Sequence, residues 1–390
     1  MSHYRDKKKI FYSTKVKMIS FLSFLWNYKF WLRFFTVICL VSLCLAYLSP
    51  FIHPKTQFLF PFFGLAYPVI LGISILFLIT WIILKSKWAW IVFGVLIIGG
   101  NLHFRMIAIG GNDEPPAKNY LHLMSYNVHL FDVFNPKLAN AKKTRNKIFN
   151  YIKTENPDII CFQEFYQKDK PTNFKTKDTI LKFMNFIDYH ERSAHKNFSR
   201  QNFGIYLFSK YPIIRKGDVI FDTQSEKDFN YCIFVDIVKN SDTFRIYNAH
   251  LQSIKLQGDY YSEKNPTNKI SQKSTIGLVI DKLKLAYPKR AEQARIIMKH
   301  IENSPYPTIV CGDFNDTPMS YTYQQFNSRL TDAFRNCGSG IGSTYVGRIP
   351  AGRIDYIFHT DNLNSCQFKI QQRAFSDHRA VSCKIYNKEK

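Results

Sequence analysis

The sequence lacks three motifs that would each define a common kind of site. Its eight cysteines contain no Cys-x-x-Cys pair, which argues against a structural zinc site. There is no Gly-x-x-x-x-Gly-Lys phosphate loop, so phosphoryl transfer driven by a nucleoside triphosphate is not expected. No serine or cysteine occupies a nucleophile elbow, and a water nucleophile is therefore favoured over a covalent intermediate.

Acidic residues are also scarce. The chain has 53 Lys and Arg against 29 Asp and Glu, a net charge of +24. Residues 1–120 contribute +10 of this and the remainder +14. A basic soluble domain favours anionic partners such as nucleic acid, phospholipid headgroups or phosphorylated small molecules. Because a lysine-rich composition also serves solubility alone, charge does not identify the partner.

Three long apolar segments, at about 30–51, 58–84 and 88–103, dominate the first third of the chain. A bilayer core needs about 20 apolar residues per helix, which the first two segments provide. A secretory signal peptide fits poorly, since apolar sequence continues beyond residue 80 without a small-residue cleavage site. We therefore expect residues 1–108 to form a membrane region of about three transmembrane helices. Buried helices of a globular domain are disfavoured by the length of the runs.

Positive charge near the helix ends predicts the orientation of this region. Seven basic residues precede the first segment, whereas the first connection holds only Lys55. This bias predicts a cytoplasmic N-terminus, and three crossings then place the following domain outside the cytoplasm, as expected for a bacterial inner membrane protein. The third segment spans only roughly 24 Å against a core of ~30 Å, with Ile107 and Ile109 available to extend it. If it does not cross, the domain is cytoplasmic.

Residues 109–120 read as a linker, because the stretch IGGNDEPPAKN is rich in Gly, Pro and polar residues. From residue 121 to 390 short apolar runs alternate with amphipathic patterns, which predicts sheets covered by helices in layers. For example, AKKTRNKIFNYIKTEN and KRAEQARIIMKHIEN have helical spacing, whereas DIICFQEF and TIVCGDFND read as buried strands. YCIFVDIV and TFRIYNAHL read as a hairpin around KNSD.

Carboxylates, amides and imidazoles recur next to these apolar strands, and we expect each to follow its strand. A single polar group at a strand end is usually structural, but several from separate strands indicate one site. Oxygen ligands from Glu, Asp and Asn suit a hard cation such as Mg²⁺. Such a site requires its metal ligands and catalytic groups to lie within about 10 Å of one another. The residues concerned are Asn127, Glu164, His250, Asp313, Asn315, Asp355, Asp377 and His378.

The ordered set SYNV, QE, NAHL, GDFND, RIDY and SDH resembles the endonuclease/exonuclease/phosphatase superfamily across residues 121–390. The resemblance implies a four-layered α/β sandwich, with two mixed β-sheets face to face and helices outside. It also implies hydrolysis of a phosphodiester or phosphomonoester with Mg²⁺ or Mn²⁺. By position, Glu164 resembles the principal metal ligand of that superfamily, with Asn127 and Asp377 assisting.

The same resemblance implies roles for the remaining residues. Asp313 would position or deprotonate the attacking water, and Asn315 would hold a phosphate oxygen. His378 would stabilise the oxygen on which charge develops, with Asp355 holding its imidazole. His250 resembles a second histidine present in the deoxyribonuclease-I-like and lipid-directed branches.

Several functions remain open from the sequence. The resemblance implies a phosphate-ester substrate, either nucleic acid, as for a nuclease, or a phospholipid headgroup, as for a sphingomyelinase-type phosphodiesterase or an inositol-phosphate phosphatase. A lysine-containing polar stretch after His250 is a candidate substrate loop, and a solvated surface loop is an equal alternative. An inactive binding module on the same fold is disfavoured by the complete set of site residues. A transporter or sensor is disfavoured because the apolar segments lack acids. We infer no protein partner beyond association with the lipid bilayer.

Overall fold

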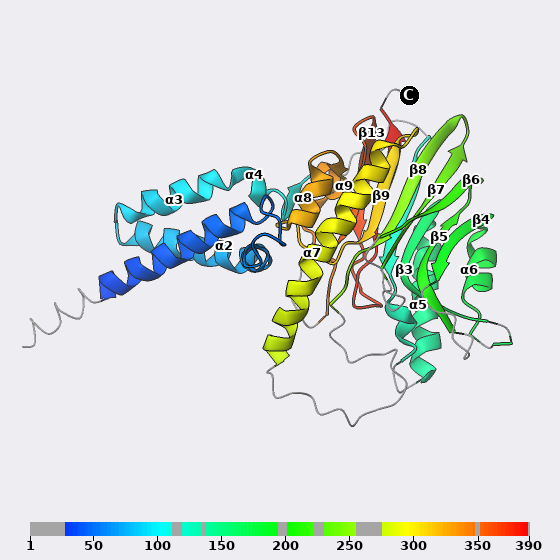
Figure 1. The fold of residues 1–390 in the computed structure, drawn as a ribbon, viewed down its shortest axis with the longest axis horizontal. Coiled ribbons are helices and arrows are strands. Elements are labelled where there is room, and N and C mark those ends of the chain that lie inside the picture. Colours follow the sequence, from blue (N-terminus) through cyan, green and yellow to red (C-terminus); the bar gives the residue numbers. More distant parts are fainter. Residues whose placement is uncertain are drawn as a thin grey trace, which may run out of the picture. The chain divides into compact units, whose positions relative to one another are not determined.

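The computed structural model describes residues 28–110, 119–134, 138–169, 171–172, 174–193, 201–221, 230–254, 275–347 and 352–388. The chain divides into two compact units. The N-terminal unit comprises Met1–Leu48 and Ala66–Gly100. The larger unit comprises Ser49–Leu65 and Asn101–Lys390. Figure 1 shows the elements of both in sequence colours.

The N-terminal unit is built from apolar helices. Helix Tyr28–Leu48 has 21 residues and α2 (Phe60–Ile83) has 24, and both are long and apolar enough to cross a membrane. A side-chain hydrogen bond joins these two helices, in which Trp81 Nε1 donates to Thr36 Oγ1 at 3.0 Å. The third helix, α3 (Trp88–Ile98), also packs here, with Val92 fully buried beside Trp81.

The third apolar segment is shorter than the sequence predicted. Helix α3 has 11 residues, or about 16 Å of rise, and ends at Gly99 before the four-residue α4 (Gly100–His103). Ile107 and Ile109 do not extend a helix, because they belong to strand β1 (Ile107–Ile109), which pairs with β11 (Ser339–Ile341). The β-branched side chains and the β11 partner favour the strand. The larger unit therefore includes residues 101–108, which precede the expected linker at 109–120. Residues 111–118 of that linker lie outside the described residues.

The larger unit contains two six-stranded mixed sheets, which confirms the predicted four-layered α/β sandwich. The first has the order β13-β14-β2-β3-β5-β4 and the second β10-β12-β9-β8-β7-β6. Only β2–β3 and β8–β9 are parallel among the neighbouring pairs. The first sheet contains β2 (Leu121–Asn127), β3 (Ile159–Lys168), β4 (Asp188–Ser193), β5 (Gln201–Ser209), β13 (Leu363–Ile370) and β14 (Val381–Asn387). The second contains β6 (Ile213–Val219), β7 (Tyr231–Lys239), β8 (Asp242–His250), β9 (Thr308–Asp313), β10 (Thr331–Asp332) and β12 (Asp355–His359).

Alternation along the strands separates an inner core from two outer ones. In β9, Ile309 and Cys311 face the core between the sheets, whereas Val310 faces the outer side. In β2, Leu123 faces inward and Met124 outward. Successive strand side chains point to opposite faces, so a strand buried on both faces reads as a continuous apolar run. This explains why TIVCG and DIICF were recognisable as buried strands.

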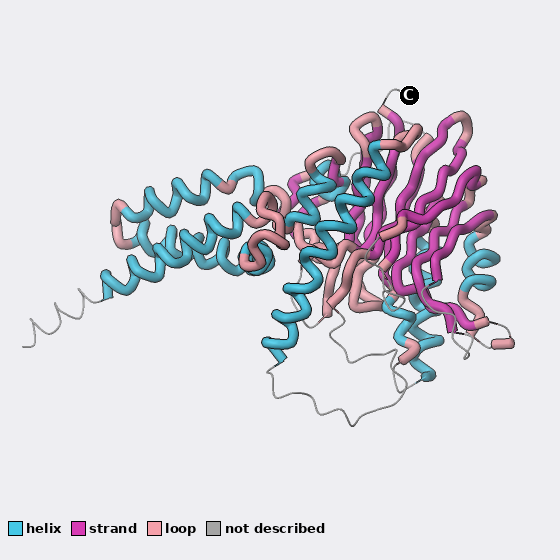
Figure 2. The backbone as a smooth tube through the Cα atoms, viewed as in Figure 1, coloured by secondary structure: helices cyan, strands magenta, loops and turns pink. Residues whose placement is uncertain are grey.

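Helices cover the outer face of each sheet (Figure 2). Ile148 and Ile152 of α5 (Leu138–Glu155) and Ile180 of α6 (Lys177–Met184) pack on the first sheet. Ala294 and Ile297 of α7 (Thr275–Glu302) pack on the second sheet. Helix α8 (Tyr321–Asn327) lies on that face, while α9 (Ala333–Cys337) contributes to the inner core. The short η1 (His129–Asp132) follows β2.

Candidate active site

The candidate residues gather at one edge of the sandwich. Asn127, His250 and Asp313 end β2, β8 and β9, as predicted. The expectation that every site residue follows a strand is wrong for Glu164, which lies within β3, and for Asp355, which begins β12. It is also wrong for Asp377 and His378, which precede β14. Antiparallel pairing explains this, because Asp355 pairs with Asp313 and Val381 with Ser125. The amino end of one strand therefore meets the carboxyl end of its neighbour.

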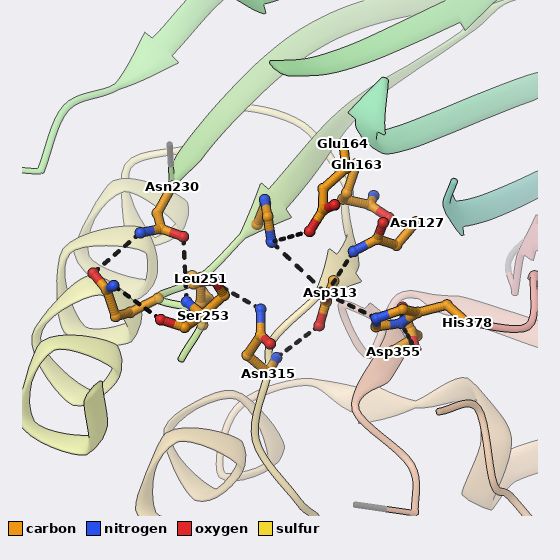
Figure 3. Close-up of polar contacts among 12 residues, drawn as sticks. Asn127, Gln163, Glu164, Asn230, Leu251, Ser253, Asp313, Asn315, Asp355 and His378 are labelled. Carbon is orange, nitrogen blue, oxygen red and sulfur yellow. Dashed lines mark hydrogen bonds and ion pairs between the residues drawn. The ribbon is translucent and has the colours of Figure 1, made fainter. Parts of the chain in front are cut away.

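Asp313 lies at the centre of this group (Figure 3). It is 1% exposed, and its Oδ2 accepts a hydrogen bond from Asn127 Nδ2 at 2.9 Å. Its Oδ1 accepts from the backbone N–H of Asn315 at 2.8 Å. Burial raises the pKa of Asp313, and the neighbouring His378 and His250 oppose that rise. A carboxylate in this setting is accessible to proton transfer at its remaining lone pairs.

A close approach of two strands fixes the backbone immediately before Asp313. Gly312 has φ +142°, a conformation that L side chains rarely adopt. A Cβ at this position would lie 1.9 Å from the carbonyl oxygen of Ala249 on β8. Since Ala249 precedes His250, the glycine of the GDFND motif lets Asp313 and His250 approach each other.

His378 is held by a carboxylate on one side and faces another. Its Nδ1 lies 2.9 Å from Asp355 Oδ2, and its Nε2 lies 3.6 Å from Asp313 Oδ2. Burial alone would lower the pKa of His378, but the Asp355 and Asp313 carboxylates raise it well above the usual value. The imidazolium is thus favoured, and its Nε2 faces Asp313 at ion-pair distance.

His250 lies between two carboxylates. Its Nε2 is 3.8 Å from both Glu164 Oε1 and Asp313 Oδ2, which brings these two acids within the expected range of each other. Both of these acids are themselves candidate site residues. Glu191, another acid of the first sheet, instead pairs with Lys177 at 3.3 Å.

Glu164, Asn127 and Asp377 form an oxygen-rich group beside Asp313. Glu164 lies within β3 at an irregularity between Phe162 and Phe165, with φ +51°. Burial raises its pKa, as does the charge of Asp377, while His129 lowers it. Asp377 Oδ1 accepts from Ser376 Oγ at 3.1 Å. This donor set fits a hard divalent cation, because carboxylate and amide oxygens are its preferred ligands.

A second group of potential ligands overlaps the catalytic residues. Ligand atoms of Asp313, Asp355 and His378 lie within 4.8 Å of one another. Mg²⁺ and Mn²⁺ prefer oxygen ligands to an imidazole nitrogen. The oxygen-only group therefore fits Mg²⁺ or Mn²⁺ better than the group that contains His378.

Asn315 is partly engaged in local structure. It adopts φ +55°, and its Nδ2 donates to the carbonyl of Leu251 at 3.1 Å. An amide nitrogen carries two hydrogens, so a second donor is available for a phosphate oxygen.

Comparison with known proteins identifies the family. The model of the endonuclease/exonuclease/phosphatase family matches residues 124–378. The chain belongs to the endonuclease/exonuclease/phosphatase family. Members of this family hydrolyse phosphate esters. A domain of unknown function, DUF8431, matches residues 29–106, and no curated protein matches the chain.

Solved structures of the endonuclease/exonuclease/phosphatase family share this fold at low identity. An endonuclease/exonuclease/phosphatase from Bacteroides vulgatus is 16% identical, with a TM-score of 0.50, covering 70% of this chain and 100% of that one. The human Nocturnin catalytic domain, solved with a bound sulfate anion, is 17% identical with the same TM-score of 0.50, covering 69% of this chain and 93% of that one. At this identity the likeness supports the fold alone.

His129 lies beside the candidate site, and the sequence did not single it out. Its Nε2 lies 4.0 Å from Asp377 Oδ2, and its backbone N–H donates to Asn127 Oδ1 at 3.0 Å. It begins a left-handed turn in which four successive residues have φ between 44° and 60°. Such a conformation costs roughly 1–2 kcal/mol per residue. Burial of Leu130 and Phe131 in the turn offsets that cost.

Tyr345 and an inter-sheet amide pair were also missed. The Tyr345 ring contacts the His378 ring edge-on at 5.1 Å, and burial with nearby carboxylates raises the pKa of Tyr345 to about 12. Gln163 Nε2 donates to Asn248 Oδ1 at 2.7 Å, joining the two sheets beneath Glu164 and His250. Both amides belong to the QE and NAHL motifs that contain the predicted residues Glu164 and His250. Their place in these motifs was the sequence signal that could have identified them. The lysine-containing stretch at 255–274 lies outside the described residues.

Proposed function

We propose that the chain is a membrane-anchored, Mg²⁺- or Mn²⁺-dependent phosphodiesterase that uses water as its nucleophile. One observation carries the proposal. Asp313 is buried, receives a hydrogen bond from Asn127 and lies between the imidazoles of His250 and His378, with an oxygen-rich group alongside (Figure 3). A base, a cationic donor and hard-cation ligands are thereby within reach of one phosphate.

Asp313 supplies the base. As the oxygen of the attacking water bonds to phosphorus, its proton passes to Asp313, and the bond from phosphorus to the leaving oxygen breaks. The leaving oxygen departs with the bonding electron pair and takes a proton from solvent, and Asp313 later returns its proton to solvent. The hydrogen bonds from Asn127 and the Asn315 backbone orient the carboxylate for this transfer. A positioned carboxylate base contributes about 10²–10⁴ to a rate.

His378 and Asn315 receive the charge that develops on the phosphoryl oxygens. His378 Nε2 donates to one oxygen, and Asp355 keeps the ring protonated and correctly turned. Asn315 Nδ2 donates to another oxygen, and His250 donates from the opposite side of Asp313. Glu164, Asn127 and Asp377 would hold the cation, which when bound supplies Lewis-acid stabilisation of the phosphate.

The helices of spanning length support an anchor in the bilayer. Residues Ser49–Leu65, which comprise the connection between these helices and the first turns of α2, belong to the same compact unit as the sheets. Within that unit, the ring of His53 contacts Tyr321 at 4.9 Å and that of Phe62 contacts Tyr287 at 5.8 Å. Lys284 Nζ lies 4.7 Å from the Phe58 ring.

These contacts bear on the side of the membrane that the enzyme occupies. A segment between the first and second crossings lies opposite the N-terminus, and a domain packed on it shares that side. The seven basic residues before residue 30 favour a cytoplasmic N-terminus. We therefore propose an extracytoplasmic catalytic unit, with the α3–α4 segment returning the chain across the bilayer.

The full-length chain in detergent micelles tests the activity. Hydrolysis of bis-p-nitrophenyl phosphate should require Mg²⁺ or Mn²⁺, be lost in EDTA and return when the ion is restored. Asp313→Asn should lower kcat by at least about 100-fold, because the base is lost. Asp361→Asn, which removes an exposed carboxylate that accepts from Thr331, is the matched control. Undiminished activity after exhaustive chelation would refute the proposal.

A further inference from the structure

The chain passes between the helical unit and the larger unit after residues 48, 65 and 100, and these passages meet one part of the larger unit. A Cβ at Gly64 would lie 2.4 Å from Ser49 Oγ and 2.6 Å from the carbonyl oxygen of Met319. Arg105 Nη1 donates to the carbonyl of Pro318, next in the chain, at 3.4 Å. If the apolar helices span a bilayer, chain continuity keeps this part of the larger unit close to the membrane surface.

Helix α7 reaches the same region through its amino-terminal half. Phe62 lies in the first turn of α2, and its ring contacts that of Tyr287 on α7 at 5.8 Å. Lys284 Nζ, one turn earlier on α7, lies 4.7 Å from the ring of Phe58. The 24 residues of α2 rise about 36 Å, more than the ~30 Å of a bilayer core, so its first turn is expected at the level of the headgroups. The part of α7 that contacts this turn is expected at the same level.

Apolar and basic side chains are exposed together around these contacts. Leu285 is 71% exposed, Leu59 52% and Phe58 47%, although each is a large apolar side chain. Three exposed lysines accompany them, and we call the whole set the juxtamembrane surface: Lys55, Phe58, Leu59, Lys282, Lys284 and Leu285.

The charge of the juxtamembrane surface is positive. Its three lysines stand against Asp281 on the same turn of α7, and the next acid along that helix, Glu292, pairs with Arg295 at 2.5 Å. In the part of the chain that the structure describes, Lys284 has no carboxylate partner and contacts only the Phe58 ring. Its ammonium is therefore accessible to an anion outside the protein.

We propose that the juxtamembrane surface docks on the headgroup layer of an anionic phospholipid bilayer. The apolar side chains Phe58, Leu59 and Leu285 enter the boundary between headgroups and acyl chains, and the lysines contact lipid phosphates. Exposed apolar groups beside basic ones are the combination that binds such an interface. The inference rests on the proposed membrane anchor and adds to it a second, reversible contact made by the catalytic unit.

Fluorescence quenching on the full-length chain tests the docking. In a Cys44→Ser background the remaining cysteines are buried, so a fluorescent maleimide reacts only with an introduced thiol. Leu285→Cys reports on the juxtamembrane surface. Lys299→Cys, an exposed position roughly 21 Å further along α7, is the matched control. Val69→Cys, which is exposed within α2, reports on the anchor.

The three labels should respond differently in nanodiscs of phosphatidylcholine and phosphatidylglycerol. Lipids that carry a nitroxide near the headgroup should quench the label at position 285 at least about twofold more than the label at position 299. Lipids with the nitroxide in the acyl chain should quench the label at position 69. Iodide in the buffer should quench the label at position 299 more than the label at position 285.

Charge reversal tests the part played by the lysines. Lys282→Glu and Lys284→Glu together should lower the ratio of docked to undocked protein by about tenfold or more, because each lysine near an anionic surface contributes about fivefold. Lys299→Glu, on the same helix, should preserve the ratio. All three side chains are exposed and outside the active site, so hydrolysis of bis-p-nitrophenyl phosphate should be unaltered.

The outcomes separate the docking surface from the anchor. If lipid quenches the label at position 69 but quenches positions 285 and 299 equally, the docking surface is wrong and the anchor stands. Shielding of position 285 from both iodide and lipid nitroxide would assign the surface to a protein partner or a second copy and would also overturn the proposal. Unaltered quenching after charge reversal would remove anionic headgroups as its partner. If position 69 is not quenched, the anchor itself fails.

Discussion

Asp355→Asn tests how the site keeps its imidazole charged. The two oxygens of Asp355 lie 3.1 and 2.9 Å from His378 Nδ1, and both side chains are buried. Asparagine keeps the size and one acceptor but removes the charge. It can also present its NH₂ group to Nδ1, which would turn the ring or favour the wrong tautomer.

The expected effect is on catalysis more than on substrate binding. Loss of one donor to a developing oxyanion costs about 10²–10³ in kcat, and we expect a decrease in that range. KM should change by less than about threefold, because Asp355 contacts His378 rather than the phosphate, and such a split marks an interaction made only in the transition state.

The pH profile gives the second readout. In the wild-type protein, the Asp355 and Asp313 carboxylates outweigh burial and raise the pKa of His378. The imidazolium therefore persists through neutral pH and is lost only as pH rises through the raised pKa. Without Asp355 that pKa falls, so the alkaline decline of kcat should begin at lower pH.

The measurement is kcat and KM for bis-p-nitrophenyl phosphate across pH at saturating Mg²⁺, with Asp361→Asn as the control. Thermal unfolding of both variants checks that the fold is retained. A kcat for Asp355→Asn within about twofold of the wild-type value, or an alkaline limb that does not move, would refute the assigned role of His378.

Three further predictions concern the cation, the strand junction and the membrane. Glu164→Ala should raise the Mg²⁺ concentration for half-maximal activity by about tenfold or more. Glu191→Ala, which removes the carboxylate that pairs with Lys177, should leave that concentration unaltered, and equal Mg²⁺ dependence in both variants would remove Glu164 from the cation site. Gly312→Ala should destabilise the protein by roughly 2–4 kcal/mol in denaturant unfolding, because its Cβ would meet the Ala249 carbonyl. Gly340→Ala, at φ +73° with open space around it, should cost only about 1 kcal/mol, and similar losses at both positions would contradict the steric argument. A reporter active only outside the cytoplasm, fused after residue 120, should be active; activity of a cytoplasmic reporter there instead would mean two crossings.

Much of the fold was predictable because burial leaves a local trace. The hairpin of β7 and β8, helix α5 and the buried strands β3 and β9 all follow from apolar periodicity. Strand β4 was not predicted, because its sequence DYHERS is half-exposed and polar and is paired only along β5. Strand β4 forms because it pairs with β5, and such pairing leaves no pattern in the sequence of β4 itself.

The residues of the candidate site likewise fall into those that the sequence identified and those that only the structure identified. Asp313, Glu164 and His378 were found because polar residues beside apolar strands stand out in a sequence. His129 and Tyr345 were not, since one depends on a left-handed turn and the other on a ring contact with His378.

The sequence by itself determined the family, the layered sheets, the apolar helices of spanning length and the chemical types at the site. Each of these is encoded in residue type and spacing along a short stretch of chain. Tertiary structure alone decided that Asp355 and His378 reach the site from the amino ends of antiparallel strands, and that 49–65 packs with the catalytic unit. These features depend on strand direction and on contacts between residues far apart in the chain, which hydrophobic periodicity does not record.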